Sequence, residues 1–286
     1  MIDGTQRRNL LGLGGAGLAL AVLDVGRAAA QAAPASQLRT VLDRGRLIVG
    51  TGSTNPPWHF EDEKGQLTGM DIAMAKILAK GLFDDVSKIE FVRQEASARV
   101  PNIVTGKVDV VIQFMTTSPA RAQLVAFSRP YYVEGAALMV APKSKFPTFK
   151  DLTAAGKAAR VSVLQNVDAD KLVHNALPEA TVMQLDSQAN VMQAVVAGRA
   201  DAAVVDASTV KWLVKRNPGD YADPGHAFGS QLYGAAVRQG DPDWLNFVNT
   251  CFNVAMHGNQ PEIYTAAFQE FFGQTPPIQV PGFPPI

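Results

Sequence analysis

The chain has a single cysteine, Cys251, and its 26 basic side chains are balanced by 26 acidic ones. One cysteine excludes an internal disulfide and any zinc cluster built on cysteine ligands. A formal net charge of zero argues against the basic surface that nucleic acids and anionic membranes require. The four histidines, His59, His174, His226 and His257, have no metal-ligand spacing. We therefore expect no metal, no other cofactor and no nucleic-acid partner.

Sequence motifs of common enzymes are also absent. The chain contains no G-x-S-x-G, no P-loop and no H-E-x-x-H. The glycine-rich segment 12–15 follows no strand pattern, so it is not a dinucleotide-binding loop. A hydrophobic content of 47% with 18% charged residues is typical of a globular protein and not of a disordered one.

The first 32 residues have the pattern of a secretory signal peptide. Arg7 and Arg8 precede an uncharged stretch, 10–23, that is too short to cross a bilayer. The small-x-small sequence A-Q-A at 30–32 is typical of a cleavage site. The paired arginines indicate the twin-arginine export route, and an ordinary signal with two chance arginines is the alternative. Either route delivers the mature protein to the periplasm.

Strand and helix patterns alternate along the rest of the chain. Short apolar runs predict strands at 46–51, 88–92, 108–112, 138–141, 160–164, 181–185 and 202–205. Apolar residues at helical spacing predict helices at 70–79, 100–105, 168–175, 188–196, 244–257 and 263–272. We expect Gly81 to end the first of these helices. The alternation predicts an α/β fold of mostly parallel sheets with helices on both faces.

One short sequence occurs twice. G-K-V-D-V-V-I at 106–112 has a counterpart in G-R-A-D-A-A-V at 198–204. Each copy follows a predicted helix, with a glycine placed to end the helix and a buried strand to follow. Two copies predict two similar α/β lobes, and the alternative is that such turns look alike by coincidence.

Three polar loops follow predicted strands, and open α/β sheets bind ligands at the carboxyl ends of their strands. These loops are 51–60, 115–121 and 205–208. In the first loop, paired prolines pre-set the backbone and Trp58 offers a flat apolar wall.

In the second loop, Ser118 can cap a helix whose first residue is Pro119. The exposed N–H groups at that helix end, with Arg121 close by, can bind a carboxylate or a phosphate. In the third loop, Asp206 comes directly after a buried strand. Taken singly, Arg121 can equally be a solvated helix residue and Asp206 a helix N-cap.

Six stretches of the chain together match a known family. They are G-R-L-I-V-G-T (45–51), N-P-P-W-H-F (55–60), L-T-G-M-D-I-A-M-A-K-I-L-A-K (67–80), R-V-P-N-I-V-T-G-K-V-D-V-V-I (99–112), M-T-T-S-P-A-R-A-Q-L-V-A-F-S-R-P-Y-Y (115–132) and G-R-A-D-A-A-V-V-D (198–206). The most specific feature is an Arg-x-Pro and a Gly-Lys-x-Asp strand before Thr/Ser-Pro-x-Arg and Phe-Ser-x-Pro-Tyr. Over residues 42–272 the chain resembles the bacterial extracellular solute-binding proteins of the polar amino-acid class, family 3.

This resemblance implies a two-lobed fold of type II with a ligand cleft. Lobe 1 would comprise residues 39–138 and 232–286, and lobe 2 residues 139–231. Crossovers near 138–142 and 231–235 would act as hinges. The resemblance also implies a periplasmic monomer that captures a small amino-acid-like solute and delivers it to the membrane permease of an ABC importer.

By the same resemblance, Arg121 would bind the ligand α-carboxylate bidentately, with Thr116 beside it, and Asp206 would accept hydrogen bonds from the α-ammonium. A zwitterion in a closed cleft needs both charges paired, because desolvation otherwise opposes binding. The other candidate ligand-binding residues are Trp58, Arg99, Asn55, Met115, Phe114, Asn166, Val167 and Asp168.

The chain departs from the family pattern at three places. Gly52 stands where many relatives carry an aspartate, and Asn55 where they carry an aromatic residue. Residues 166–168 replace a frequent Gly-Thr-Thr, so Asp168 either meets the ligand or only caps the next helix. Arg99 either reaches the ligand side chain, which favours a polar or acidic amino acid, or only binds loop carbonyls. Asp168 would instead favour a cationic ligand.

An enzyme is the alternative class, because periplasmic cyclohexadienyl dehydratases resemble the same fold. Such an enzyme needs a general acid or base near a carboxylated ring substrate. His59, Glu95 or Asp168 could supply one, and nothing in the sequence marks any of them. We therefore expect a binding protein without enzymatic activity.

Overall fold

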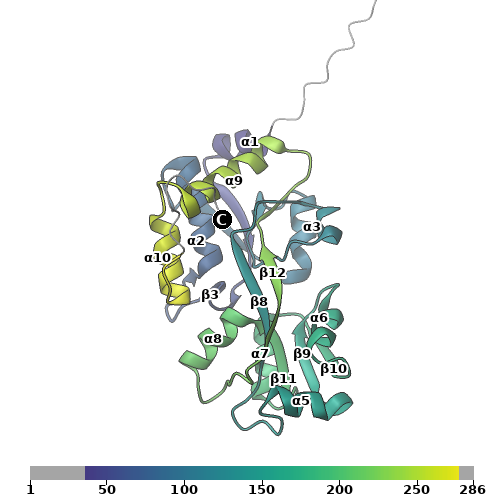
Figure 1. Ribbon diagram of the computed structural model, residues 1–286. Helices are drawn as coiled ribbons and strands as arrows, with labels where there is room; N and C mark the ends of the chain where they lie inside the picture. Colours follow the sequence, from purple (N-terminus) through teal and green to yellow (C-terminus); the bar gives the residue numbers. More distant parts are fainter. Residues whose placement is uncertain (1–35, 277–286) are drawn as a thin grey trace, which may run out of the picture. The chain divides into compact units, whose positions relative to one another are not determined.

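The computed structural model describes residues 36–276, so the predicted signal peptide and residues 277–286 lie outside the described part (Figure 1). Strands and helices alternate there as predicted. The helices are α1 (Gln37–Arg44), α2 (Met70–Phe83), α3 (Arg99–Val104), α4 (Pro119–Ala122), α5 (Phe149–Ala155), α6 (Ala169–Ala176), α7 (Gln188–Val196), α8 (Ala207–Arg216), α9 (Pro242–His257) and α10 (Glu262–Phe272). Within residues 36–276, no helix has the length and apolar character that crossing a membrane requires.

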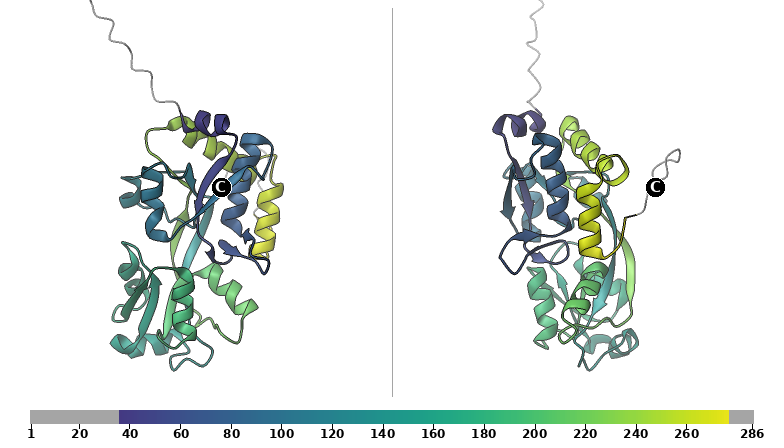
Figure 2. Two further views of the ribbon diagram at one scale, coloured as in Figure 1. Left: turned by 180° about the vertical axis from the view of Figure 1, so that it is seen from behind. Right: turned by 90° about the vertical axis from the view of Figure 1, so that its left-hand side faces the viewer.

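The first sheet contains five strands. Their order is β5 (Ile89–Arg93), β1 (Leu47–Thr51), β6 (Val110–Val111), β13 (Ala236–Val237) and β7 (Ala126–Phe127). β1 is parallel to β5 and β6, whereas β13 is antiparallel to β6 and β7. Successive residues of β1 face opposite sides: Val49 packs in the core with α2, α9 and α10, and Ile48 packs on the side of α3. Figure 2 shows α10, in yellow, beside α2 and α9.

The second sheet also contains five strands. Its order is β10 (Thr181–Leu185), β9 (Arg160–Leu164), β11 (Ala202–Asp206), β8 (Tyr132–Met139) and β12 (Ala227–Tyr233). β9 is parallel to β10 and β11, and β8 is antiparallel to β11 and β12. In both five-stranded sheets, four strands run in one direction and one runs against them, β13 in the first sheet and β8 in the second. Apolar residues of α5 and α6 pack on one face, and those of α7 and α8 on the other. The helices on both faces agree with the predicted fold class.

A small antiparallel sheet completes the described part. It consists of β2 (Thr54–Asn55), β3 (His59–Glu61) and β4 (Leu67–Thr68). It is attached to the start of α2, where the Asp71 N–H donates to the Trp58 carbonyl at 2.8 Å. On its other side it meets the start of α8, where the Thr209 hydroxyl donates to the Pro56 carbonyl at 3.0 Å. The small sheet therefore connects α2, which packs on the first five-stranded sheet, with α8, which follows β11 in the second.

The repeated sequence forms the same αβ unit in both sheets. The glycine that opens each copy has a positive φ, 73° in the first and 66° in the second, and follows a helix. The aspartate of each copy then binds the start of the neighbouring parallel strand through its side chain. Asp109 accepts from the Ile48 N–H at 2.7 Å, and Asp201 accepts from the Arg160 N–H at 2.9 Å. The two copies are thus structural counterparts at the level of this αβ unit.

β8 and β12 are the strands that connect the two sheets (Figure 1). They pair with each other from Tyr132 opposite Tyr233 onward, and β8 already pairs with β11 at Ala136–Met139. The chain thus joins the second sheet before Leu138, earlier than the predicted crossover at 138–142. The second predicted crossover, 231–235, spans the end of β12, and β13 follows it in the first sheet.

The prediction that Gly81 ends its helix is wrong. α2 continues to Phe83, and Asp84 caps it with a φ of 55°. A Cβ atom on Gly81 would lie 2.6 Å from Cys251 Sγ on α9. The glycine therefore allows α2 and α9 to approach closely, which a sequence read for helix ends alone does not reveal.

Candidate functional site

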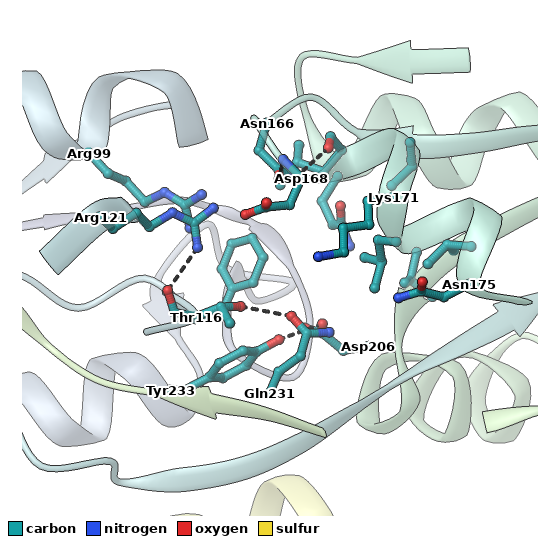
Figure 3. Close-up of a pocket in the computed structure, with 17 residues that line it drawn as sticks. Arg99, Thr116, Arg121, Asn166, Asp168, Lys171, Asn175, Asp206, Gln231 and Tyr233 are labelled. Atoms are coloured by element: carbon teal, nitrogen blue, oxygen red, sulfur yellow. Dashed lines mark hydrogen bonds between the residues drawn. The ribbon is translucent and has the colours of Figure 1, made fainter. Parts of the chain in front are cut away.

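A cavity of about 240 Å³ lies at the carboxyl ends of β6, β9 and β11. Open α/β sheets bind ligands at this end of their strands. Its walls come from the loops that follow these three strands, from β12 and from residues of α3, α6 and α7 (Figure 3). Seven of the predicted ligand-binding residues line it, namely Arg99, Phe114, Thr116, Arg121, Asn166, Asp168 and Asp206.

Arg121 is held by the turn that the sequence predicted. Pro119 is the first residue of α4, and the Ser118 hydroxyl accepts from the Arg121 N–H at 3.3 Å. The guanidinium donates from Nη1 to the Thr116 carbonyl at 2.8 Å. Burial lowers the pKa of Arg121, and the charge of Asp168 opposes that effect. Within residues 36–276 its other guanidinium N–H groups make no hydrogen bond, so they can serve a ligand.

Arg99 is buried at the wall of the cavity. Its side chain is 5% exposed, and it donates to the Ala96 carbonyl at 2.9 Å and to the Gln113 carbonyl at 3.2 Å. Its guanidinium carbon lies 5.3 Å from the centre of the Phe114 ring. Burial and the neighbouring Arg121 lower the pKa of Arg99 to about 10. Arg99 thus binds loop carbonyls and still lines the cavity.

Asp206 is 6% exposed at the end of β11. Its Oδ1 accepts from the Tyr233 hydroxyl at 2.6 Å, and its Oδ2 has no partner among the described residues. Burial raises the pKa of Asp206 well above its usual value, and the nearby Glu134 adds to this. Asp206 occupies the N-cap position of α8, yet its side chain makes no capping bond. The Asp206 carboxylate therefore keeps one oxygen that can accept a hydrogen bond from a cationic group.

Asp168 also stands at an N-cap position, that of α6, without a capping bond from its side chain. Asn166 shapes this loop, because its Oδ1 accepts from the Asp168 N–H at 2.9 Å and its Nδ2 donates to the Leu164 carbonyl at 2.8 Å. The Asp168 carboxylate points across the cavity toward Arg99 and Arg121 (Figure 3). The cavity therefore holds positive and negative groups face to face.

Trp58 and Asn55 do not line the cavity, contrary to the sequence prediction. Both are buried where the small sheet meets α8. The Trp58 indole donates to the Ser208 hydroxyl at 3.1 Å, and Asn55 accepts from the Thr209 hydroxyl at 3.3 Å. The Ser208 hydroxyl in turn donates to the buried carboxylate of Glu134. These residues connect elements of the fold.

Met115 and Val167 also lie outside the cavity. Met115 is buried in the core beside α3, whereas Val167 is 83% exposed. Both line an adjacent hollow of about 560 Å³ that shares Arg99, Arg121 and Asn166 with the cavity. Their contact with a ligand held inside the cavity is therefore not supported by their positions.

Of the three candidate acid–base residues, only Asp168 lines the cavity. His59 is buried, with Nδ1 2.8 Å from an Asp71 carboxylate oxygen that also accepts from the Phe114 N–H at 2.9 Å. His59 thus helps to hold Asp71, which in turn fixes the backbone at Phe114. Burial raises the pKa of Glu95, which lines a small adjacent hollow together with His59.

The sequence prediction missed several residues of the cavity wall. Lys171 and Asn175 lie on the same side of α6 as Asp168, at helical spacings that could have been noticed. Gln231 and Tyr233 project from β12, and Gln231 Oε1 accepts from the Thr116 hydroxyl at 2.7 Å. Their position follows from the pairing of β12 with β8, for which the sequence carries no local signal.

Comparison with known proteins assigns a family to this arrangement. The family model described as "Bacterial extracellular solute-binding proteins, family 3" matches residues 47–273. The ABC transporter glutamine-binding protein of Bacillus subtilis is 25% identical over 235 residues, or 82% of this chain and 85% of that protein. The L-cystine-binding protein of Escherichia coli is 30% identical over 214 residues, or 74% of this chain and 78% of that protein.

Solved structures agree with this family. An ancestral amino acid-binding protein, described as a precursor of cyclohexadienyl dehydratase, has a TM-score of 0.70 at 32% identity and covers 83% of this chain and 100% of its own. The cysteine-binding protein of Campylobacter jejuni has a TM-score of 0.73 at 26% identity and covers 83% of this chain and 93% of its own. These matches confirm the predicted type II periplasmic binding protein fold.

Proposed function

Because the chain belongs to the bacterial extracellular solute-binding proteins of family 3, we propose that it binds a small amino acid or a related zwitterion in the cavity and delivers it to an ABC importer. One observation carries this proposal. Arg121, on α4 after β6, and Asp206, at the end of β11, both line one cavity, and each has a polar atom without a partner among the described residues.

The two anchors suit the two charges of an amino acid. The planar guanidinium of Arg121 can hold an α-carboxylate through two parallel N–H donors. Asp206 Oδ2 can accept from an α-ammonium while Oδ1 keeps its bond to Tyr233. An arriving cation favours the ionised form of Asp206 and lowers the pKa that burial raises. Both ligand charges then exchange water for a partner, which offsets the cost of their desolvation.

Closure of the cleft is the second part of the proposal. The connecting strands β8 and β12 can bend as a pair and bring the loops after β9 and β11 toward Arg121. We propose that residues 1–32 direct export to the periplasm, where the protein acts as a monomer and presents its ligand to the permease.

A thermal-shift screen with free amino acids, opines and small carboxylates tests this function. A ligand present at about 100 times its dissociation constant stabilises the folded protein by roughly 2.7 kcal/mol, so a match should raise the melting temperature clearly. Isothermal titration calorimetry should then give a stoichiometry of one. If no amino acid or amino-acid derivative binds, the proposed function is wrong.

We propose binding without turnover. Of the three candidate acid–base groups, Asp168 lines the cavity, so the dehydratase alternative depends on this residue. The dehydratase alternative has its own assay. The protein is incubated with prephenate, and phenylpyruvate is measured over time with Asp168→Asn as the matched variant. Phenylpyruvate formation by the unmodified protein that is lost in Asp168→Asn would replace transport with catalysis as the function.

A further inference from the structure

Five charged side chains line the cavity among the described residues: Arg99, Arg121, Lys171, Asp168 and Asp206. The ligand anchors proposed above are Arg121 for the α-carboxylate and Asp206 for the α-ammonium. A bound zwitterion therefore leaves two cations and one anion without a ligand partner. Lys171 and Asp168 are exposed at the cavity, so a further charge on the ligand can reach them.

Lys171 is the cation of this set that no protein group engages. Arg99 uses two N–H groups on carbonyls, and Asp168 faces both arginines. Lys171 makes no hydrogen bond or ion pair with any residue in 36–276, while Lys80 and Lys145 elsewhere pair with aspartates. Figure 3 shows its ammonium directed into the cavity from α6, on the side opposite the Arg121 guanidinium.

The surroundings of Lys171 suit a second anionic group. Asn175 lies one helical turn further along α6 and also lines the cavity, so it can add an amide donor beside the ammonium. A ligand whose α-carboxylate lies on Arg121 extends its side chain across the cavity toward this face of α6. An ammonium at that point attracts a carboxylate and repels the ammonium or guanidinium of a basic amino acid.

We propose that Lys171 binds an acidic group in the ligand side chain, so that the ligand is an amino acid with a second carboxylate or an equivalent acidic group. The proposal rests on the function proposed above and names the ligand class of the same cavity. It gives Lys171 a specificity role and predicts that the charge of the ligand, more than its size, decides selection.

The test measures affinities by titration calorimetry for glutamate, aspartate, glutamine, asparagine, lysine and arginine. The variants are Lys171→Gln, Lys171→Glu and the control Lys150→Gln. Lys150 is exposed on α5, which packs on the same sheet face as α6 but lies outside the cavity. Thermal unfolding of each variant establishes that it is folded, and an exposed lysine on a helix is easily replaced.

We expect the unmodified protein to bind one acidic amino acid more tightly than its amide. Lys171→Gln should raise the dissociation constant of that acidic amino acid at least about tenfold, as expected for the loss of one hydrogen bond between charged groups. It should change the dissociation constant of the corresponding amide by less than about threefold. Lys171→Glu should shift the preference toward lysine or arginine, and Lys150→Gln should have no effect.

The outcomes that contradict the proposal are distinct. If amides or basic amino acids bind as tightly as acidic ones and Lys171→Gln changes nothing, the role of Lys171 is refuted and the amino-acid-binding function stands. If no amino acid binds to the unmodified protein, the function and the ligand class fail together.

Discussion

Replacing Arg121 with alanine should separate ligand binding from folding. The side chain lines the cavity, and its contact with the protein is the bond from Nη1 to the Thr116 carbonyl at 2.8 Å. A ligand carboxylate bound there would keep only Thr116 and the more distant Arg99 as partners after the truncation. The change therefore removes the direct partner of a desolvated charge.

The expected loss follows from that geometry. Truncating one member of a buried, hydrogen-bonded charge pair costs about 2–5 kcal/mol of binding free energy. This corresponds to a dissociation constant that is roughly 30-fold to 5,000-fold larger. Folding should respond differently, because Arg121 is itself one cause of the lowered pKa of Arg99. Removal of this neighbouring positive charge should leave the free energy of unfolding unchanged or slightly higher.

Calorimetry with the ligand from the screen measures the first effect, and urea unfolding without ligand measures the second. Arg121→Lys is the matched variant, since it keeps the charge but loses the planar pair of donors, and it should also bind weakly. Near-normal affinity of Arg121→Ala would refute the assignment of Arg121. A large loss of stability in that variant would show that the residue serves the fold instead.

Three further predictions concern charge, motion and packing. Because burial raises the pKa of Asp206, the contribution of this residue to the free energy of unfolding of the ligand-free protein should fall as the pH rises above the unfolded value of about 3.9. Asp206→Asn should therefore make the slope of the free energy of unfolding against pH more positive, and it should abolish binding. Urea unfolding at several pH values measures the slope, and an unchanged slope would contradict it. Small-angle scattering should give a smaller radius of gyration with ligand than without, and an equal radius would count against hinge closure. Gly81→Ala should destabilise by about 1–3 kcal/mol because its Cβ meets Cys251 Sγ, so a higher melting temperature would contradict the close packing of α2 and α9.

The fold could be predicted from the sequence wherever one element has a uniform apolar pattern. The strands at 160–164 and 181–185 and the helix at 188–196 have the predicted bounds, because the apolar residues within each element are enough to define it. β8 was harder to predict because Glu134 and Gly135 interrupt its apolar run. The two-residue strands β7 and β13 exist through their partners and have no pattern of their own.

The site could be predicted where a side chain follows directly from a strand end. Arg121 lies on α4 after β6, Asp206 is the last residue of β11, and the fold brings both to one cavity. Trp58 was predicted to offer a flat apolar wall to the ligand. In the structure its ring packs against Tyr132 and its indole N–H donates to Ser208, both distant in the sequence. Lys171 was overlooked because one lysine on a polar helix face has no signature until its orientation is known.

The contact between the small sheet and α8 allows affinity and selectivity to evolve separately. If the cleft closes as proposed, its opening would break the bonds from Trp58 to Ser208 and from Thr209 to Pro56, and neither bond involves a cavity-lining residue. The strength of these bonds would then set the fraction of empty molecules that are already closed, and apparent affinity scales with the population of the binding-competent state. Substitutions in this contact would then change how tightly every ligand is held without changing which ligand is chosen, so relatives with similar cavities could serve habitats with very different solute concentrations.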